Sequence, residues 1–346
     1  MSVLAADPAA TVAVAPRRRR RGEGGVGRYA VRRTLSAGAT LVFVVVFNFF
    51  LFRVLPGDPI ALYTRGRNVD RERLAELRRA LNRPLTEQFW SYSQNPFSQA
   101  IDSTRFSRPV WEVIGDRVWP TLLLLGVSTA LAAGIGIWLG IRSAWERGGR
   151  FDRISTGVTL TLYAMPEFWL GMLLLIVLST GVGVFPGIFP SGGVSSPGED
   201  TSSISGVLDI AWHLTLPALT LTLAYLAEYS LVMRSSLVDE MSQDYLLTAR
   251  AKGLMDRLVR RRHAVPNAML PTISLIFLNI GFVVSGAITV ETVFSWPGLG
   301  QLSYEAIRGP DVALLQAIFL LFSLAVVVAN LLADLLVAAM DPRVRQ

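Results

Sequence analysis

The chain has 346 residues, of which 51% are hydrophobic and 17% are charged, and its formal net charge is +7. Its apolar residues gather in runs long enough to cross a bilayer, which predicts a polytopic, all-α membrane protein. The absence of cysteine excludes disulfide and thiolate chemistry. The positive charge lies in a tail and in loops that flank the apolar runs, so it indicates membrane topology and argues against nucleic-acid binding.

Residues 1–33 form a segment rich in Ala, Pro, Gly and Arg that includes the basic run Arg17–Arg21. The segment shows no helical or strand periodicity, and we predict a disordered cytoplasmic tail. The apolar stretch at 34–55 follows it. A secretory signal peptide is the alternative interpretation, but this stretch is too long for one, and it is predicted to remain as the first transmembrane helix.

Further spans of roughly 20 residues bring the expected total to six. These later spans are Trp119–Ile141, Ile154–Thr180, Trp212–Met233, Leu270–Phe294 and Val312–Met340. Arginines are dense in the loops after the second and fourth spans and sparse in the loops after the third and fifth. By the positive-inside rule, both termini and the two arginine-rich loops are predicted to be cytoplasmic.

The loop at 56–118 must then be extracytoplasmic, although it carries ten arginines. Loops longer than about 60 residues translocate largely regardless of charge, and we interpret this one as a small structured insert. Within it, the segment Val69–Leu81 places Leu74, Leu77 and Leu81 on one helical face, which predicts an amphipathic surface helix. Residues 119–346 would form the core membrane domain.

Small residues recur at helical spacing in two of the spans. Ala132, Gly136 and Gly140 lie on one face of the second span, and Gly281 and Ser285 lie on one face of the fifth. Such stripes let a neighbouring helix backbone approach closely. Gly281 and Ser285 are also candidates for the lining of a path through the membrane.

Prolines and carboxylates interrupt the apolar spans. Pro166 and Pro217 each remove one backbone hydrogen bond and favour a kink, although proline is also common in membrane helices that do not bend for a function. Glu167 and Glu228 lie in otherwise apolar helices, where a charged side chain is costly and faces a cavity or a partner. Both are candidates for a transmembrane path, and the alternative is a hydrogen-bonded structural acid.

The loop at 234–269 combines helix-forming and basic segments. Gly253 is expected to end a first helix, and a second basic segment follows at 257–263. Before the glycine, side chains recur at helical spacing, at Leu237, Met241, Tyr245 and Thr248. We expect two short helices joined at Gly253 and lying flat against the membrane. The alternative is a basic loop that binds anionic lipid headgroups.

This loop resembles the cytoplasmic loop of the permease subunits of ATP-binding-cassette (ABC) importers, which carries the pattern E-A-A-x(3)-G-x(9)-I-x-L-P. Counted from Gly253, the corresponding positions are Leu247–Ala249 before it and His263–Pro266 after it. Leu247 stands where relatives have glutamate, so a salt bridge made by that glutamate is not implied here. The resemblance implies a coupling helix that docks on an ATPase subunit, formed by Thr248, Ala249, Arg250, Ala251, Lys252, Gly253 and Leu254.

The chain is more specifically similar to the first of the two permease subunits of dipeptide and oligopeptide importers. The resemblance runs in order from about Arg33 to the C-terminus. The resemblance rests on eight short sequence motifs. These are Leu-Pro-Gly-Asp-Pro at 55–59, Arg-Pro-Leu-Thr-Glu-Gln-Phe at 83–89, Pro-Glu-Phe-Trp-Leu at 166–170, Phe-Pro-Ser-Gly-Gly at 189–193, Arg-Ser-Ser-Leu at 234–237, Thr-Ala-Arg-Ala-Lys-Gly-Leu at 248–254, Val-Glu-Thr-Val-Phe-Ser-Trp-Pro-Gly-Leu-Gly at 290–300, and Asp-Pro-Arg-Val-Arg at 341–345.

The resemblance implies a type I importer permease fold and several partners. These are a second homologous permease subunit, two ATPase subunits that bind ATP and magnesium, and an extracytoplasmic peptide-binding protein. The chain has no G-x-x-x-x-G-K-[ST] phosphate loop, so we expect a transport subunit without an ATPase site of its own. Glu167 replaces the small polar residue of relatives and is a candidate to bind the ammonium group of a peptide.

Two other segments have expected positions. The turn at Glu291–Gly300 is expected to face outward, where a substrate-delivery protein could contact it. His213 and His263 are expected near opposite membrane faces, so they would not form a metal site.

Alternatives remain for the transported substance and for the mechanism. Similar permeases import nickel, glutathione, haem or sugars, and selectivity in this group resides largely in the binding protein. A proton-coupled secondary transporter would instead use Glu167 or Glu228 as proton carriers, and an inverted internal repeat would support it. A membrane enzyme would need a nucleophile beside a base, and the sequence offers no such pair.

Overall fold

A computed structural model of the chain describes residues 26–54, 75, 78–79, 82–94, 103, 105–182, 185–286 and 288–340, without the side chains of 26, 54, 185, 280–286, 337, 339 and 340. The amphipathic helix predicted at Val69–Leu81 lies mostly outside these residues. The described elements are α1 Val26–Val54, α4 Leu85–Gln94, α5 Val110–Trp145, α6 Arg150–Tyr163, α7 Glu167–Leu174, the π-helix η1 Leu175–Thr180, β1 Gly181–Val182, β2 Phe185–Pro186, α8 Ile204–Glu240, α9 Asp244–Ala251, α10 Asp256–Val259, the π-helix η2 Arg260–Ala264, α11 Val265–Gly286, α12 Ile288–Val293, α13 Leu299–Arg308 and α14 Val312–Met340.

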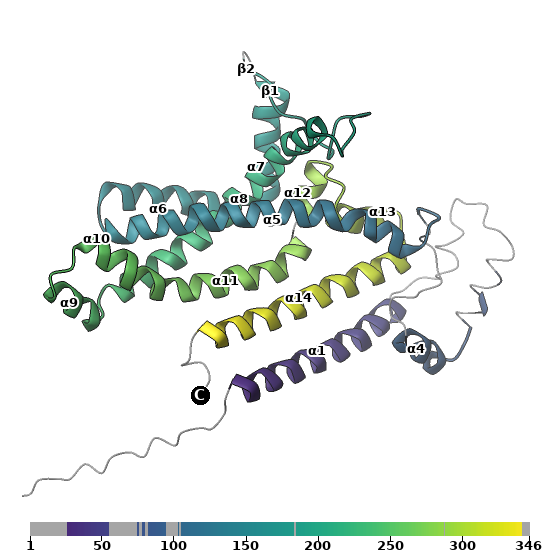
Figure 1. The fold of residues 1–346 in the computed structure, drawn as a ribbon. Helices are drawn as coiled ribbons and strands as arrows, with labels where there is room; N and C mark the ends of the chain where they lie inside the picture. Colours follow the sequence, from purple (N-terminus) through teal and green to yellow (C-terminus); the bar gives the residue numbers. More distant parts are fainter. Residues whose placement is uncertain are drawn as a thin grey trace, which may run out of the picture.

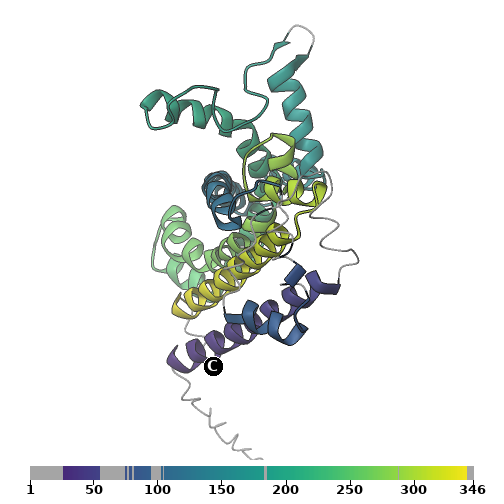
Figure 2. The same ribbon diagram turned by 90° about the vertical axis from the view of Figure 1, so that its right-hand side faces the viewer.

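The long helices pack in layers (Figure 1). α1 lies against α14, α14 against α11, and α11 against α5 and α8, while α6 packs along α5 and α8. The segment α7–η1 and the antiparallel pair β1–β2 stand off this bundle, as the turned view in Figure 2 also shows. The bundle is therefore built around the α5–α8 pair, with α1 as its outermost helix.

The small-residue stripe of α5 allows α8 to approach closely. A Cβ atom added at Gly136 would lie 2.7 Å from Tyr229 Cβ, and one at Gly140 would lie 2.6 Å from the Ser230 carbonyl oxygen. Ala132 is fully buried one turn earlier. Both distances are shorter than a non-bonded contact permits, so the two glycines are required for this packing. The close approach predicted from this stripe is confirmed.

The predicted third span is broken in the middle. α6 ends at Tyr163 and α7 begins at Glu167, and the two helices meet at an angle of 100°. Pro166 has extended backbone angles, with φ −60° and ψ 135°. Proline lacks an N–H and disfavours the helical conformation in the residue before it, so the helix stops and restarts in a new direction. The kink predicted at Pro166 is confirmed, whereas α8 continues through Pro217.

Four described helices are long and apolar enough to cross a membrane, namely α1, α5, α8 and α14, and the bent pair α6–α7 would make five. The predicted fifth span at 270–294 is covered by α11, which is described to Gly286, and by α12, which is described from Ile288. The total of six spans and the extracytoplasmic position of the insert stay predictions.

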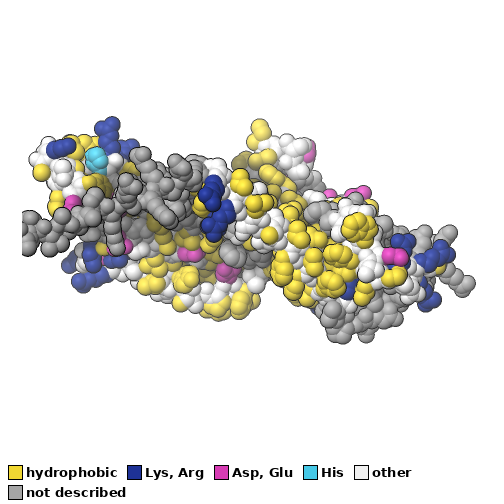
Figure 3. Space-filling model, turned by 90° about the horizontal axis from the view of Figure 1, so that it is seen from below, with side chains coloured by type: hydrophobic (Ala, Val, Ile, Leu, Met, Phe, Trp, Pro, Cys, Tyr) yellow, Lys and Arg dark blue, Asp and Glu magenta, His cyan; other side chains and the backbone are white. Residues whose placement is uncertain are grey.

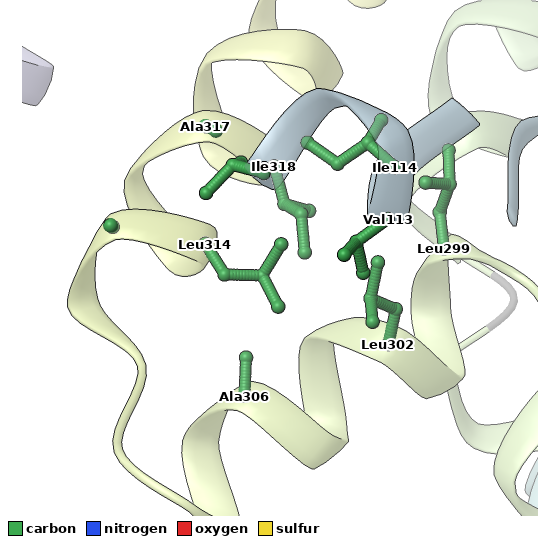
Figure 4. Close-up of a cluster of buried hydrophobic side chains, with 10 residues drawn as sticks. Val113, Ile114, Leu299, Leu302, Ala306, Leu314, Ala317 and Ile318 are labelled. Carbon is green, nitrogen blue, oxygen red and sulfur yellow. The ribbon is translucent and has the colours of Figure 1, made fainter. Parts of the chain in front are cut away.

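Two helices begin earlier in the chain than predicted. α1 begins at Val26, so residues 26–33 are helical and do not belong to a disordered tail. α5 begins at Val110, so residues 110–118 are helical and continuous with the second predicted span, while their extracytoplasmic position stays a prediction. Figure 4 shows the reason for the second difference, because Val113 and Ile114 pack with residues of α13 and α14 in a buried apolar cluster. These contacts bring residues from distant parts of the sequence together, and local periodicity does not report them.

Polar contacts fix α1 to the rest of the bundle near both of its ends. The buried Asn48 side-chain amide donates to Tyr92 Oη in α4 and to the Gln316 carbonyl in α14, both at 3.1 Å. Near the start of α1, Arg33 Nη1 lies 3.1 Å from Asp334 Oδ2 of α14. Because α1 buries little of its apolar surface, these contacts contribute directly to its position.

Candidate functional site

The segment between α8 and α11 contains the two short helices predicted there. α8 extends to Glu240 and α11 starts at Val265, so the loop proper is 241–264 and is shorter than the predicted 234–269. Gly253 has φ +81°. Its N–H donates to the Arg250 carbonyl at 2.9 Å, and the Leu254 N–H donates to the Ala249 carbonyl at 3.4 Å. This is the Schellman pattern that ends a helix at a left-handed glycine, as the sequence predicts.

One face of α9 is packed into the protein. Leu246 is 1% exposed and Ala249 is 8% exposed. They belong to an apolar cluster that joins α9 to α5, α8, α10 and α11, and whose buried members are Ala144, Met233, Leu237, Leu246, Ala249, Val259, Ala264 and Ala268. Close packing of this kind transmits displacement. α9 is therefore a rigid extension of the transmembrane helices.

Polar contacts add to this packing. The Tyr245 hydroxyl bonds to the Glu240 carboxylate, lies 3.1 Å from the His263 carbonyl, and accepts a bond of 3.0 Å from Asn267 Nδ2. Burial and the Glu240 carboxylate raise the pKa of Tyr245, so it remains a hydroxyl at neutral pH. These contacts connect the start of α9 to the end of α8 and the start of α11.

The outer face of the same segment is exposed and mixed in character. Leu247 and Met255 are 60% and 75% exposed, on either side of the Gly253 turn, and the Arg250 guanidinium lies 3.2 Å from the Asp256 carboxylate across that turn. Of the predicted docking residues, Ala249 faces inward and Leu254 is half-buried, whereas the exposed ones are Thr248, Arg250, Ala251, Lys252 and Gly253. Apolar side chains flanked by charges on a fixed, protruding turn suit contact with another protein.

A buried ion pair braces α8 just before this loop. Arg234 Nε and Nη2 donate to the two carboxylate oxygens of Asp152 at 2.6 and 2.8 Å, and the Gly148 N–H donates to the same carboxylate at 2.9 Å. Asp152 is 4% exposed. A two-pronged arginine–carboxylate pair fixes orientation as well as distance. Sequence reasoning missed this pair, and the only available signal was two acids, Glu146 and Asp152, among four arginines at 142–153.

The two intramembrane carboxylates both lie beside hydrogen-bonding groups of other helices. Glu167, at the start of α7, is half-buried and lies close enough to interact with the hydroxyl of Tyr225 in α8. Glu228, one turn further along α8, accepts a bond of 3.0 Å from Asn279 Nδ2 of α11. Asn279 also lies 3.3 Å from Tyr229 Oη. α7, α8 and α11 thus meet at a polar cluster within the apolar bundle.

The other two predicted path residues lie beyond Asn279 in α11. The backbone of Gly281 and Ser285 is helical, and their side chains are outside the described part of the chain. Their position relative to the two carboxylates therefore stays a prediction.

The turn expected to contact a delivery protein is largely internal. Glu291 and Trp296 are both fully buried. The Glu291 carboxylate accepts bonds from Thr121 Oγ1 at 2.8 Å and from the Gln301 N–H at 3.0 Å, and Trp296 Nε1 donates to the Pro120 carbonyl at 2.9 Å. These two side chains join the turn to α5 and are not available for contact with a delivery protein, while the extracytoplasmic position of the turn stays a prediction. Burial of these groups could not be deduced from local sequence.

The two histidines are far apart in the chain and in different elements. His213 lies in α8, with Nδ1 at 2.9 Å from the Asp209 carbonyl, and His263 lies in η2. Among the residues that the structure describes, no group of three or more His, Asp or Glu side chains is placed to hold a metal ion.

Comparison with known proteins connects this arrangement to a family. Residues 136–346 match the model described as binding-protein-dependent transport system inner membrane component, and residues 26–105 match the corresponding N-terminal model. The chain is 37% identical to a glutathione transport system permease protein, GsiC, of Pectobacterium atrosepticum, over 92% of this chain and 98% of the relative. It is 36% identical to an oligopeptide transport system permease protein, AppB, of Bacillus subtilis, over 91% and 98%.

Solved structures of the MetNI methionine ABC transporter in inward-facing conformations share the fold. One of their chains superposes with a TM-score of 0.54 at 17% identity and covers 68% of this chain and 100% of its own length. The fold is thus that of a type I importer permease. Together with the matches along the sequence, it establishes that the chain belongs to the binding-protein-dependent transport system inner membrane component family and is an inner-membrane permease of the peptide-type ABC importers.

Proposed function

We propose that this permease imports peptides, either di- and oligopeptides or small peptides of the size of glutathione, by ATP-driven alternating access. The single observation that carries the proposal is the α9–Gly253–α10 segment, which is exposed on its outer face and packed on its inner face against α5, α8, η2 and α11. The names of the similar permeases, for glutathione and for oligopeptides, support a peptide substrate.

In this mechanism the segment is the coupling helix. Its exposed residues, with Leu247 and Met255 beside the turn, would enter a groove of a partner ATPase subunit, which binds ATP and magnesium. Closure of the ATPases would displace α9 as a rigid body. The cluster around Leu246 and the Tyr245 contacts would pass this displacement to α8 and α11, and the Asp152–Arg234 pair would pass it to α6.

The free energy for the transition would come from nucleotide. A ligand shifts a conformational equilibrium only through its different affinities for the two states. ATP bound between the ATPases would favour the outward-open state, and hydrolysis would return the transporter to the inward-open state. The bend between α6 and α7 would place the Glu167–Tyr225 contact between segments that can rotate relative to one another.

The carboxylates of that cluster are the groups we propose for contact with substrate. A free peptide carries an ammonium group, and Glu167 and Glu228 would offer it negative charge within an apolar bundle. Gly281 and Ser285, on the same helix as Asn279, would complete the lining. A second homologous permease would supply the other half of the path, and an extracytoplasmic peptide-binding protein would deliver the peptide. Both termini would be cytoplasmic.

The test is transport by the assembled complex in proteoliposomes. Peptide-stimulated ATP hydrolysis and ATP-dependent peptide uptake are expected. Gly253→Trp should abolish uptake while the chain still inserts and assembles with the second permease, because the bulky side chain blocks docking. Gly198→Trp is the matched control, since Gly198 is exposed and also has a positive φ, +85°, with no atom within 4 Å of an added Cβ. Normal uptake by Gly253→Trp, or proton-driven uptake by this chain alone, would contradict the proposal.

A further inference from the structure

A long groove runs between α1 and α14 on the outermost side of the bundle. Its larger part has a volume of about 510 Å³ and a lining that is almost entirely apolar, which includes Val44 of α1 and Phe319, Phe322 and Val326 of α14. α12 and α13 contribute to its far end. The volume lies in the range of small-molecule sites. Figure 3 views the molecule from the side of α1 and shows hydrophobic side chains over much of that face.

A smaller, more polar cavity of about 120 Å³ continues the groove toward the start of α1. The two cavities share Thr40, Val327 and Asn330, and the smaller one ends at Arg33 and Asp334. The groove is therefore apolar along most of its length and charged at one end. This is the polarity of a phospholipid, whose acyl chains are apolar and whose headgroup is charged.

The charged end is net positive. Arg28, Arg32 and Arg33 lie within two turns of α1, and Asp334 is the acid that contacts Arg33, so these groups sum to 3 − 1 = +2. The Arg33 side chain is 46% exposed and uses Nη1 for Asp334 and Nε for the Tyr29 hydroxyl. A guanidinium has five N–H donors, so Arg33 retains donors for a phosphate oxygen. Basic pockets between membrane helices bind anionic lipid headgroups.

The dimensions of the groove agree with one lipid leaflet. Arg33 and Val44 are separated by eleven residues of α1, which is about 16 Å of helix. Half of a hydrocarbon core of about 30 Å is about 15 Å. A phosphate at Arg33 would therefore place an acyl chain along the apolar part of the groove, beside Phe322 and Phe319.

Asn330 lies where the two cavities meet, and its Oδ1 is buried without a hydrogen-bond partner within the described residues. The Asn330 side chain lines both cavities, at the depth of the ester groups that lie just below the phosphate in a phospholipid, and an amide can both donate and accept hydrogen bonds there.

We propose that this groove binds one anionic phospholipid, with its phosphate at Arg33 and an acyl chain packed on Phe319 and Phe322. Most of the surrounding surface of α1 is exposed and apolar, so lipid has direct access to the groove. The bound lipid would hold α1, which has little buried surface of its own, against α14. The site is independent of the coupling segment.

The first test measures lipid retained by the purified transporter complex. The complex would be incorporated into nanodiscs of phosphatidylcholine with a minor fraction of phosphatidylglycerol, and native mass spectrometry would count bound phosphatidylglycerol. Arg33→Gln should lower its occupancy about fivefold, the effect of one basic residue near a membrane surface. Arg53→Gln, at the other end of the same helix, is the matched control and should leave occupancy unchanged. Equal retention by the Arg33→Gln complex and the native complex would overturn the proposal.

The second test locates the acyl chain and does not depend on the Arg33–Asp334 contact. Phosphatidylglycerol with a photoreactive group in its acyl chain should cross-link to the α14 peptide that contains Phe319 and Phe322, and phosphatidylcholine with the same group should do so less. Val327→Trp, which fills the groove, should abolish this cross-link. Because the chain has no native cysteine, Ser323→Cys gives a single site for cross-linking to protein. Cross-linking of that cysteine to the second permease would show a subunit interface and refute a lipid site.

Discussion

Substitution of Gly136 by alanine tests the packing on which the α5–α8 pair depends. The added Cβ would lie 2.7 Å from Tyr229 Cβ and 2.9 Å from the Leu226 carbonyl oxygen. Two carbon atoms prefer a separation of roughly 3.5 Å or more, so α8 must move away by about 1 Å. The neighbouring atoms belong to a Cβ and to the backbone, which cannot rotate aside. Overpacking of this kind costs about 1–3 kcal/mol.

A second substitution on the same helix separates packing from helix propensity. Replacing glycine by alanine within a helix stabilises it by about 1 kcal/mol, and this gain applies equally to Gly136→Ala and to Gly134→Ala. An added Cβ at Gly134 meets no atom within 4 Å. The difference in stability between the two variants therefore isolates the cost of overpacking, about 1–3 kcal/mol.

The measurement is thermal denaturation of the purified complex, followed by loss of monodisperse protein on size-exclusion chromatography. Gly134→Ala should melt at or above the temperature of the native protein, and Gly136→Ala should melt below both. Equal melting temperatures for the two variants would refute the close approach of α5 and α8, because contact with α8 is what distinguishes the buried Gly136 from the exposed Gly134.

Two further predictions concern the connection between the loop and the membrane helices. Asp152→Asn removes one partner of the charged pair with Arg234 and should lower the free energy of unfolding by about 2 kcal/mol. It should also reduce peptide-stimulated ATP hydrolysis more than basal hydrolysis. An unchanged ratio of stimulated to basal hydrolysis would contradict a role of the pair in transmitting movement from the loop to α6. Tyr245→Phe removes the hydroxyl that contacts Glu240 and Asn267, so the backbone amides of α9 should exchange hydrogen faster while the amides of α5 are unaffected. Hydrogen exchange with mass spectrometry would measure this. Unchanged exchange in α9 would show that apolar packing alone holds α9 in place.

Local chemistry explains why some features could be predicted from the sequence. Gly253 ends α9 because only glycine adopts φ +81° without a steric penalty, and this depends on one residue. Pro166 interrupts a span because it lacks an N–H. Gly136 and Gly140 mark a close helix contact because their spacing places both on one face. Each of these features is present in a short stretch of chain.

Features that join distant segments could not be predicted in this way. Asp152 and Arg234 are 82 positions apart, and Glu291 contacts Thr121 across 170 positions. The sequence around Glu291 and Trp296 predicted a turn on the outer side of the membrane, but the burial of both side chains follows from the position of α5 beside them. The same holds for the start of α5, which the apolar cluster with α13 and α14 extends to Val110.

By itself, the sequence determined that the chain is an α-helical membrane protein, where several of its helices stop, and which family it resembles, because hydrophobic length, glycine and proline act on their immediate neighbours. Only the tertiary structure decided the direction of α7 after its bend, the inward face of α9, the partners of Glu167 and Glu228, and the groove between α1 and α14. These depend on which surfaces meet when apolar helices exclude lipid and water from between them. That arrangement is a property of the whole bundle.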